Sequence, residues 1–412
     1  MQFVLFYQSL VSDWNHLTAH FLRGIASELL GAGHSVRIFE PIEGWSLHNL
    51  REQGGDGVVK AFHSTYPQLR SSLYDPLTLD LDAALADADV VIAHEWTDPG
   101  FLRRLGRHRA ERGHYSLLFH DAPHHPLRSL QRPQVLRALT LTHFDGVLAS
   151  TERVRRVYEQ HHWAQRAWVW REAVDTRLFH PQRTPAAASF DLIFIGDWGD
   201  ADRATQLNEF LIDPVRTLGW RARCYGERYP TDAVRTLRAA GIDYGGWVPD
   251  FCLPAALATG RFTVHVPRTL GSDGLRCSSV IRVLQALACG IPVVSAPWDA
   301  CEELFAPGLD LLIGTDGAQI QRHLTQLRND RELARAVTAH GYRTVMGRHT
   351  CRHRAMELLS ICGELRKAER KDELRRYGAG DLALPGNLPA TPHVAAAHRP
   401  APPRSHAPAA WS

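Results

Sequence analysis

The stretch RCSSVIRVLQALACGIPVVSAP, residues 276–297, decides the class of fold. Apolar residues recur in it at helical spacing until Gly290 and Pro292, which stop a helix. The apolar run 292–296 that follows is short enough for a strand in the core of a parallel sheet. The stretch therefore predicts a helix over 276–289 that leads into a buried strand, as in an α/β domain.

The front of this predicted helix has the composition of a phosphate site. Ser278 and Ser279 lead into it, and Arg276 and Arg282 flank its first turns. Free backbone N–H groups at a helix N-terminus and guanidinium groups both donate to phosphate oxygens. An ordinary helix with a capping serine has the same residues, so the pattern alone leaves both interpretations open.

Length and composition restrict the class of protein. A chain of 412 residues is too long for one ordinary core, so two domains are expected. The net charge of +3 is small and the basic residues are spread along the chain, which gives no support for nucleic-acid binding. Seven cysteines without a CxxC pair indicate a reducing compartment and argue against a zinc site. Without a signal-peptide pattern or an apolar run of membrane-spanning length, the chain is expected to be cytoplasmic and to have no transmembrane segment.

Strand and helix patterns alternate along the first half of the chain. Short apolar runs are separated by amphipathic helical patterns, which predicts a parallel, doubly wound sheet. The glycine-rich segment 44–57 lacks periodicity and is expected to form a loop. The predicted strands cover residues 3–7, 35–39, 89–93, 116–119, 146–149 and 168–170, and the predicted helices cover 17–30, 101–112 and 152–162.

The same alternation restarts after residues 181–190, which have the composition of a linker. Residues 191–346 predict a second α/β domain, and helical patterns fill 316–375. The proline- and alanine-rich residues 378–412 are expected to form a disordered tail, because they cannot bury enough apolar surface to fold. The predicted strands of this domain cover 191–195, 221–225, 242–245, 262–266, 292–295 and 309–313, with a helix over 203–218.

Two common ligand classes lack their motifs. A dinucleotide site would need GxGxxG after the first strand, whereas Gly31 and Gly33 follow a helix, as a C-cap does. Asp-x-Asp pairs occur at 80–82, 87–89 and 200–202, but the first two precede a strand and the third stands where an N-cap is expected. We therefore expect neither a bound metal nor a bound cofactor.

Residues 191–356 resemble glycosyltransferase group 1 proteins, and most closely the CgeB-like branch named for spore maturation. The segments that carry the resemblance are IGDWGDADR (195–203), GGWVPDFCLP (245–254), HVPR (265–268), IRVLQALACGIPVVSAPW (281–298) and GRHTCRHR (347–354). In the first half, HFLRGIASELLGAGHSVR (20–37) and WREAVDTRLFHP (170–181) are similar to the start and the end of the N-terminal domain in that superfamily.

The resemblance implies a GT-B fold, with two Rossmann-like domains that face a cleft and a C-terminal crossover helix over 347–377. It places the nucleotide-sugar on the C-terminal domain and the acceptor on the N-terminal domain, residues 1–180. The donor-binding residues that it implies are Arg276, Ser278, Ser279 and Arg282 at the start of the helix, Gly196, Gly199 and Arg203 around a glycine loop, and Trp247, Val248 and Pro249 for the nucleotide base.

Gln285 departs from the family pattern, which usually has a glutamate here that accepts hydrogen bonds from ribose hydroxyls. Cys277, eight residues earlier, also replaces a residue that is often acidic. Glutamine keeps one acceptor oxygen but loses the charge. Altered donor binding and binding without turnover both fit this departure.

The candidate residues for the acceptor side follow the strands of the first domain. His94 stands at a position similar to one near the sugar in related enzymes, with Glu95 beside it. His120 and Asp121 end another predicted strand, and residues 15–16 open the first helix. A catalytic base needs hydrogen-bond reach to an acceptor hydroxyl. Capping or surface roles are the alternative for each histidine.

The sequence therefore predicts a metal-independent glycosyltransferase that moves a hexose-type sugar from a nucleoside diphosphate to an unknown acceptor. Two alternatives are left open. One is a GT-B nucleotide-sugar-binding protein with weak or no catalysis, and the other is a GT-B sugar epimerase. The expected partner in each case is a nucleotide-sugar, with no nucleic acid.

Overall fold

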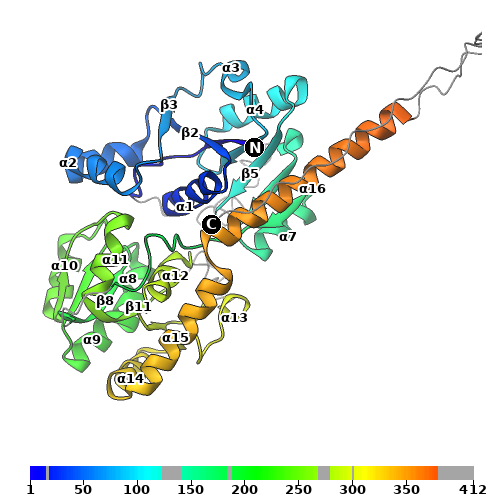
Figure 1. Ribbon diagram of the computed structural model, residues 1–412. Helices are drawn as coiled ribbons and strands as arrows, with labels where there is room; N and C mark the ends of the chain where they lie inside the picture. Colours follow the sequence, from blue (N-terminus) through cyan, green and yellow to red (C-terminus); the bar gives the residue numbers. More distant parts are fainter. Residues whose placement is uncertain (15–17, 123–140, 183–187, 268–278, 299–300, 379–412) are drawn as a thin grey trace, which may run out of the picture. The chain divides into compact units, whose positions relative to one another are not determined.

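The computed structural model describes residues 1–14, 18–122, 141–182, 188–267, 279–298 and 301–378 (Figure 1). Residues 1–367 form one compact unit that contains two parallel β-sheets. Figure 1 shows helices on the faces of both sheets. The fold is that of two Rossmann-like domains with C-terminal helices, which confirms the predicted fold class.

The N-terminal sheet has seven strands in the order β3-β2-β1-β4-β5-β6-β7. Its central strands are buried on both faces, which explains their unbroken apolar sequences. The strand order reverses between β1 and β4, so the loops after these strands diverge there. The elements are β1 (Gln2–Phe6), α1 (Thr18–Gly31), β2 (Ser35–Pro41), α2 (Trp45–Thr65), β3 (Ser71–Tyr74), α3 (Leu81–Leu85), β4 (Val90–His94), α4 (Pro99–Arg112), β5 (Ser116–Asp121), η1 (Leu141–His143), β6 (Gly146–Ala149), α7 (Glu152–Gln160) and β7 (Ala167–Val169).

The C-terminal sheet has six strands in the order β10-β9-β8-β11-β12-β13, with the reversal between β8 and β11. Its elements are β8 (Phe190–Ile195), α8 (Ala201–Leu207), the π-helical η2 (Asn208–Ile212), α9 (Asp213–Leu218), β9 (Ala222–Tyr225), α10 (Thr231–Ala239), β10 (Ile242–Tyr244), η3 (Asp250–Cys252), α11 (Leu253–Ala258), β11 (Gly260–His265), α12 (Ile281–Ala288), β12 (Val293–Ser295), α13 (Cys301–Leu304), β13 (Leu312–Ile313), α14 (Gly317–Asn329) and α15 (Arg331–Arg348).

The last helix, α16 (Cys351–Gly378), returns to the N-terminal domain. Its buried residues Leu358 and Leu365 belong to the same apolar cluster as Phe3 and Phe21. The indole Nε1–H of Trp170 donates to the carbonyl of Arg354 over 2.9 Å, which fixes the start of this helix. The chain therefore crosses from the C-terminal domain back to the N-terminal one.

Most predicted strands and helices are confirmed to within a few residues, but two predictions are wrong. Residues 44–57 do not form a loop, since α2 begins at Trp45 and continues through them. Its buried residues Leu50 and Phe62 outweigh the poor helix propensity of the glycines, and the helix breaks locally at Gly55, where φ is 62°. The helix predicted over 276–289 begins only at Ile281, as α12.

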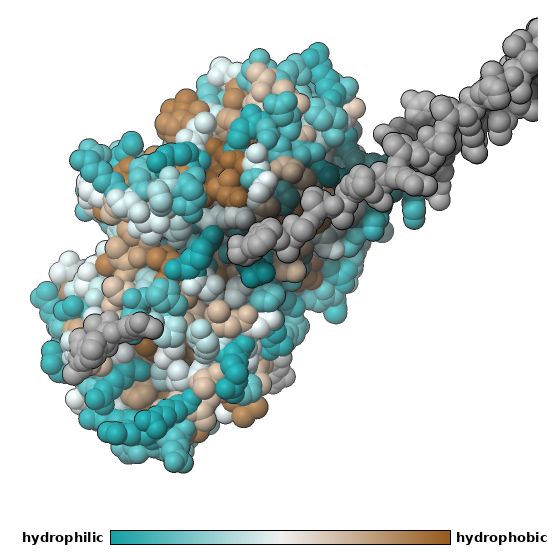
Figure 2. All heavy atoms as spheres, viewed as in Figure 1, coloured by the Kyte–Doolittle hydropathy of each residue, from teal (hydrophilic) through white to brown (hydrophobic). Residues whose placement is uncertain are grey.

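Some predicted features lie outside the described residues. These are Arg276, Cys277, Ser278, residues 15–16, residues 183–187 of the linker and the tail after residue 378. Within the described part of the chain, no helix is both long and apolar enough to cross a membrane. The face shown in Figure 2 is mostly hydrophilic, with small apolar patches.

The contact between α1 and α16 can be tested at Gly24. A Cβ there would overlap the buried Sγ of Cys351, whereas a Cβ at Gly31 in the same helix would have no atom within 4 Å. We expect Gly24→Ala to lower the free energy of unfolding by about 1–3 kcal/mol, because overpacking must push the helices apart. Gly31→Ala is the matched control, and urea unfolding is the measurement. Equal stability of the two variants would contradict this packing.

Candidate active site

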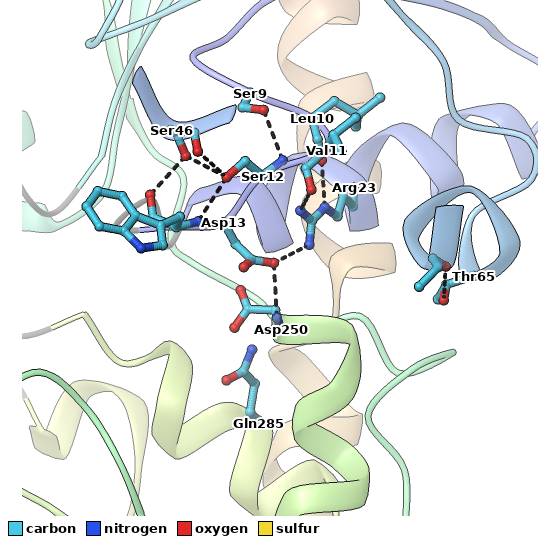
Figure 3. A network of polar contacts seen from close by, with 12 residues as sticks. Ser9, Leu10, Val11, Ser12, Asp13, Arg23, Ser46, Thr65, Asp250 and Gln285 are labelled. Atoms are coloured by element: carbon cyan, nitrogen blue, oxygen red, sulfur yellow. Dashed lines mark hydrogen bonds and ion pairs between the residues drawn. The ribbon is translucent and has the colours of Figure 1, made fainter. Parts of the chain in front are cut away.

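Arg23 organises the loop that follows β1. This α1 residue is fully buried. Its guanidinium donates to the carbonyls of Leu10 (2.7 Å) and Val11 (2.8 Å) and to Asp13 Oδ2 (2.7 Å) (Figure 3). One side chain thus satisfies three acceptors of the loop, which holds residues 10–13 in a fixed conformation.

Asp13 connects this loop to the C-terminal domain. Its Oδ2 also accepts a hydrogen bond from the backbone N–H of Asp250 over 3.0 Å. Burial raises the pKa of Asp13 to about 6, although the neighbouring Arg23 cation acts to lower it. Figure 3 shows the two carboxylates of Asp13 and Asp250 close together. This polar contact therefore carries two like charges, which need cations nearby.

Arg282 supplies the second cation. Its Nη1 donates to Asp250 Oδ1 and to Gln285 Oε1, the latter over 2.8 Å. Burial acts to raise the pKa of Asp250, but the charge and hydrogen bond of Arg282, together with the nearby His20 and Arg23, outweigh it and the pKa is lowered. The Arg282 side chain is 23% exposed, whereas that of Asp250 is almost fully buried.

Gln285 does not face solvent in this structure. The residue is fully buried, and its Oε1 accepts from Arg282. Its Nε2 is buried and has no hydrogen-bond partner among the described residues. Gln285 thus accepts a hydrogen bond from Arg282, and its side-chain oxygen is not exposed to a ribose.

The start of α12 already binds a carboxylate. Glu172, from the segment after β7, accepts from the Ser279 hydroxyl over 2.6 Å and from the Val280 N–H over 2.8 Å. Burial raises the pKa of Glu172 to about 7, although these hydrogen bonds and the Arg282 charge act to lower it. The N-terminal end of α12 therefore binds an anion, and in this structure the anion is the Glu172 carboxylate of the N-terminal domain.

The glycine loop after β8 is held by a different arginine contact. The buried guanidinium of Arg203 donates to the carbonyls of Val266 and Pro267 at the end of β11. Asp200 accepts from the Arg203 N–H over 3.0 Å and caps α8, as the sequence predicts. Arg203 therefore anchors a strand end in this structure and does not project as a free donor.

The two predicted glycines have different environments. Gly199 has a φ of 71°, a conformation that favours glycine. The Gly196 carbonyl accepts from the Tyr229 hydroxyl over 2.9 Å. Gly199 therefore allows the turn of the loop, and Gly196 connects the loop to Tyr229.

Trp247, Val248 and Pro249 form the irregular, partly buried segment between β10 and η3. Val248 packs against the apolar cluster that includes α12. This segment leads directly into Asp250, so the predicted base-binding residues lie next to the charged network.

His94 and His120 lie inside the N-terminal domain. Their exposed fractions are 0% and 2%. The Tyr7 ring stacks on His94 at 4.8 Å, and the Tyr7 hydroxyl is 2.8 Å from His120 Nδ1. Burial lowers the pKa of His120 to about 3, so this imidazole is neutral at physiological pH.

Glu95 and Asp121 form a pair of buried acids next to these histidines. The Tyr158 hydroxyl donates to Asp121 Oδ2 over 2.7 Å. Asp121 Oδ1 and both carboxylate oxygens of Glu95 have no partner within the described part of the chain. Burial raises the pKa of Asp121 to about 7, and burial followed by the Asp121 charge raises that of Glu95 further above its ordinary value. The pair is expected to hold a proton at neutral pH.

Asp13, Glu172 and Asp250 are not among the site residues expected from the sequence. Each is an acidic residue whose partners lie far away in the chain, so no local spacing indicates its role. Glu172 and Asp250 could have been noticed only from their positions, because both lie inside segments that resemble the family, 170–181 and 245–254.

The Arg23–Asp13 ion pair can be tested by removing the cation. We expect Arg23→Met to lower the free energy of unfolding by about 3–5 kcal/mol, because it leaves Asp13 charged and buried without its partner. Arg235, whose side chain is 73% exposed, gives the matched control Arg235→Met, which should stay near the wild-type value. Urea unfolding at neutral pH measures both. A small loss in Arg23→Met would show that the pair does not hold the loop.

The raised pKa of Glu172 should make the free energy of unfolding depend on pH. Its pKa of about 7 in the folded protein lies above the ordinary 4.5, so the folded state binds this proton more tightly than the unfolded state. The wild type therefore loses stability as pH rises from about 4.5 to 7, by up to about 3 kcal/mol from this group. Glu172→Gln cannot titrate. We expect the stability of the variant relative to wild type to increase over this range in urea unfolding, and a pH-independent difference would contradict the assignment.

Comparisons with known proteins agree with this architecture. A family model described as "Glycosyltransferase Family 4" matches residues 18–178, and one described as "Glycosyl transferase-like" matches residues 203–360. No curated protein matches the chain.

Several solved structures share the fold. Sucrose-phosphate synthase from Thermosynechococcus elongatus has a TM-score of 0.58 at 13% identity, over 89% of this chain and 100% of its own. HepE from Anabaena, in complex with UDP and glucose, has a TM-score of 0.62 at 15% identity, over 88% and 100%. A glycosyltransferase from Rickettsia africae has a TM-score of 0.61 at 11% identity, over 89% and 98%. At these low sequence identities, the similarity establishes a shared fold and nothing about function. Both halves of the chain thus match glycosyltransferase families, and the fold is that of the GT-B glycosyltransferases.

Proposed function

We propose that this protein transfers a sugar from a nucleoside-diphosphate sugar to an acceptor hydroxyl, without a metal ion. The observation that carries the proposal is the anion site at the start of α12. Ser279 and Val280 already donate two hydrogen bonds to a carboxylate there, and Arg282 lies one turn further on. Phosphate oxygens take the same donors.

In the proposed reaction, the bond between the anomeric carbon and the diphosphate oxygen breaks while the acceptor oxygen bonds to that carbon. The nucleoside diphosphate leaves with the bonding electrons, and the acceptor proton passes to a base. Ser279, Val280 and Arg282 would stabilise the charge that develops on the leaving group. Donors that are fixed in advance lower such a barrier, and the loss of one typically costs about a hundred- to a thousandfold in rate.

Glu172 must leave the anion site when the diphosphate binds, since both need the same two donors. Its raised pKa makes the protonated, weakly held form accessible near neutral pH. For the base we propose the Glu95–Asp121 pair. His94 and His120, the residues directly before them in the chain, pack against each other with ring centroids 5.2 Å apart. A carboxyl that titrates near pH 7 is suited to proton transfer.

The family resemblance of residues 191–356 supports two finer parts of the proposal, a hexose-type sugar and membership of the CgeB-like branch. The cysteine pattern supports action in the cytoplasm. HepE was solved with UDP and glucose, which favours UDP-glucose among the donors to be tried first.

The test is donor binding and diphosphate release by the full chain against UDP-, GDP-, TDP- and ADP-sugars, with and without EDTA. We expect one nucleotide class to bind and to be hydrolysed slowly, unaffected by EDTA. Arg282→Ala should slow diphosphate release by about a hundredfold or more. Arg235→Ala, on the exposed side of α10, should release diphosphate at the wild-type rate.

Three other outcomes would contradict the proposal in different ways. Binding with no turnover, even with cell extract as a source of acceptor, would indicate a binding protein. Conversion of the donor sugar without transfer would indicate an epimerase. No binding of any nucleotide-sugar would refute the anion site.

A further inference from the structure

Three tryptophans gather at the carboxyl edge of the N-terminal sheet. Trp14 follows β1, Trp45 opens α2 after β2, and Trp96 follows β4. The Trp45 ring lies 6.0 Å from that of Trp14 and 6.0 Å from that of Trp96, with interplanar angles of 73° and 64°. Residues from three separate loops thus form one group, which we call the indole platform. This edge is where ligands of parallel α/β sheets bind.

The indole platform does not belong to the core. Among the described residues, the four buried apolar clusters include none of its three members. The Trp96 residue is 37% exposed, and Trp14 and Trp45 are partly buried. Large aromatic surface left outside a core usually marks a binding site.

Trp14 also has an unmatched polar atom. Its Nε1–H is buried and finds no acceptor in the described part of the chain. A buried donor without an acceptor is unfavourable, because it has lost water and gained no hydrogen bond.

Hydrogen bonds hold the platform in place. The Ser46 hydroxyl donates to the Trp14 carbonyl over 2.9 Å, and the Ser12 hydroxyl donates to the Ser46 carbonyl over 2.8 Å (Figure 3). Asn49 donates to the Trp45 carbonyl over 2.8 Å. Because the loops are fixed to one another, a ligand would not have to order them on binding.

A hollow of about 410 Å³ adjoins the platform. Its apolar lining includes Trp45, Ile42 and Leu47, and its polar lining includes Glu43, His48 and Arg51. Such a volume is within the range of small-molecule sites, which combine aromatic walls with a few polar groups. The lining presents both hydrogen-bond donors and acceptors beside a flat indole.

We propose that the acceptor is a saccharide whose ring stacks on the exposed indole of Trp96, which the other two indoles of the platform support edge-to-face. A pyranose ring has a face of C–H groups and an edge of hydroxyls. The C–H face suits the electron-rich indole surface, and the hydroxyls suit Glu43, His48 and Arg51, which line the adjoining hollow. This inference rests on the proposed function, because it names the acceptor for the same transfer reaction.

The test is the binding of neutral gluco-, galacto- and manno-oligosaccharides to the full chain, followed by calorimetry and tryptophan fluorescence. We expect at least one series to bind. Trp96→Ala should weaken that binding about tenfold, as expected for the loss of one stacked aromatic contact. Trp96→Phe keeps a ring and should restore most of the affinity.

Trp163 provides the matched control. It stacks on His161 at 4.6 Å after α7, away from the platform, so Trp163→Ala should bind the saccharide like wild type. Circular dichroism of every variant excludes loss of the fold. Equal effects of Trp96→Ala and Trp163→Ala would overturn the proposal.

Donor binding, measured in parallel, separates the two proposals. Intact nucleotide-sugar binding with no saccharide binding would overturn the acceptor assignment and leave the transferase standing. Binding of alkyl detergents or peptides in place of saccharides would also overturn it. Saccharide binding that needs Trp96, without any donor binding, would support the platform and refute the proposed transfer.

Discussion

The buried ion pair between Arg23 and Asp13 is the interaction on which the candidate site depends. It holds the loop after β1, and through Asp13 it also positions the backbone of Asp250 in the other domain. Asp250 in turn orients Arg282 at the start of α12. A buried ion pair contributes little net stability when compared with apolar residues, but breaking one member is costly. The network therefore fixes geometry more than it adds stability, and the geometry is what a diphosphate site needs.

The sequence alone predicts the architecture well, because the signals for it are local. Unbroken apolar runs such as 116–119 indicate strands buried on both faces, and Gly290 with Pro292 marks the end of α12. The predicted loop over 44–57 is wrong because the glycines of this segment lower its helix propensity. The helix α2 forms there because Leu50 and, further along, Phe62 are buried against other parts of the fold. Tertiary packing therefore overrides the low helix propensity of this segment.

The candidate site could be predicted only in part. Ser279 and Arg282 are close in sequence, so their place at one helix end follows from helical spacing. Their partners Glu172 and Asp250 cannot be found in this way, since 107 and 32 residues separate the bonded pairs. The same holds for the indole platform, whose three members come together only because the sheet order places β2, β1 and β4 side by side.

Through Glu172, donor binding in the proposed reaction is coupled to the contact between the two domains. Its carboxylate comes from the N-terminal domain, whereas Ser279 and Val280 belong to the C-terminal domain. A diphosphate that takes these two donors must therefore break a contact between the domains, and the free energy of that contact is subtracted from donor affinity. Protonation weakens the contact, because a neutral carboxyl is a poorer acceptor than a carboxylate. Donor binding, the charge of Glu172 and the contact between the two domains are then linked, and a change in any one of them alters the other two.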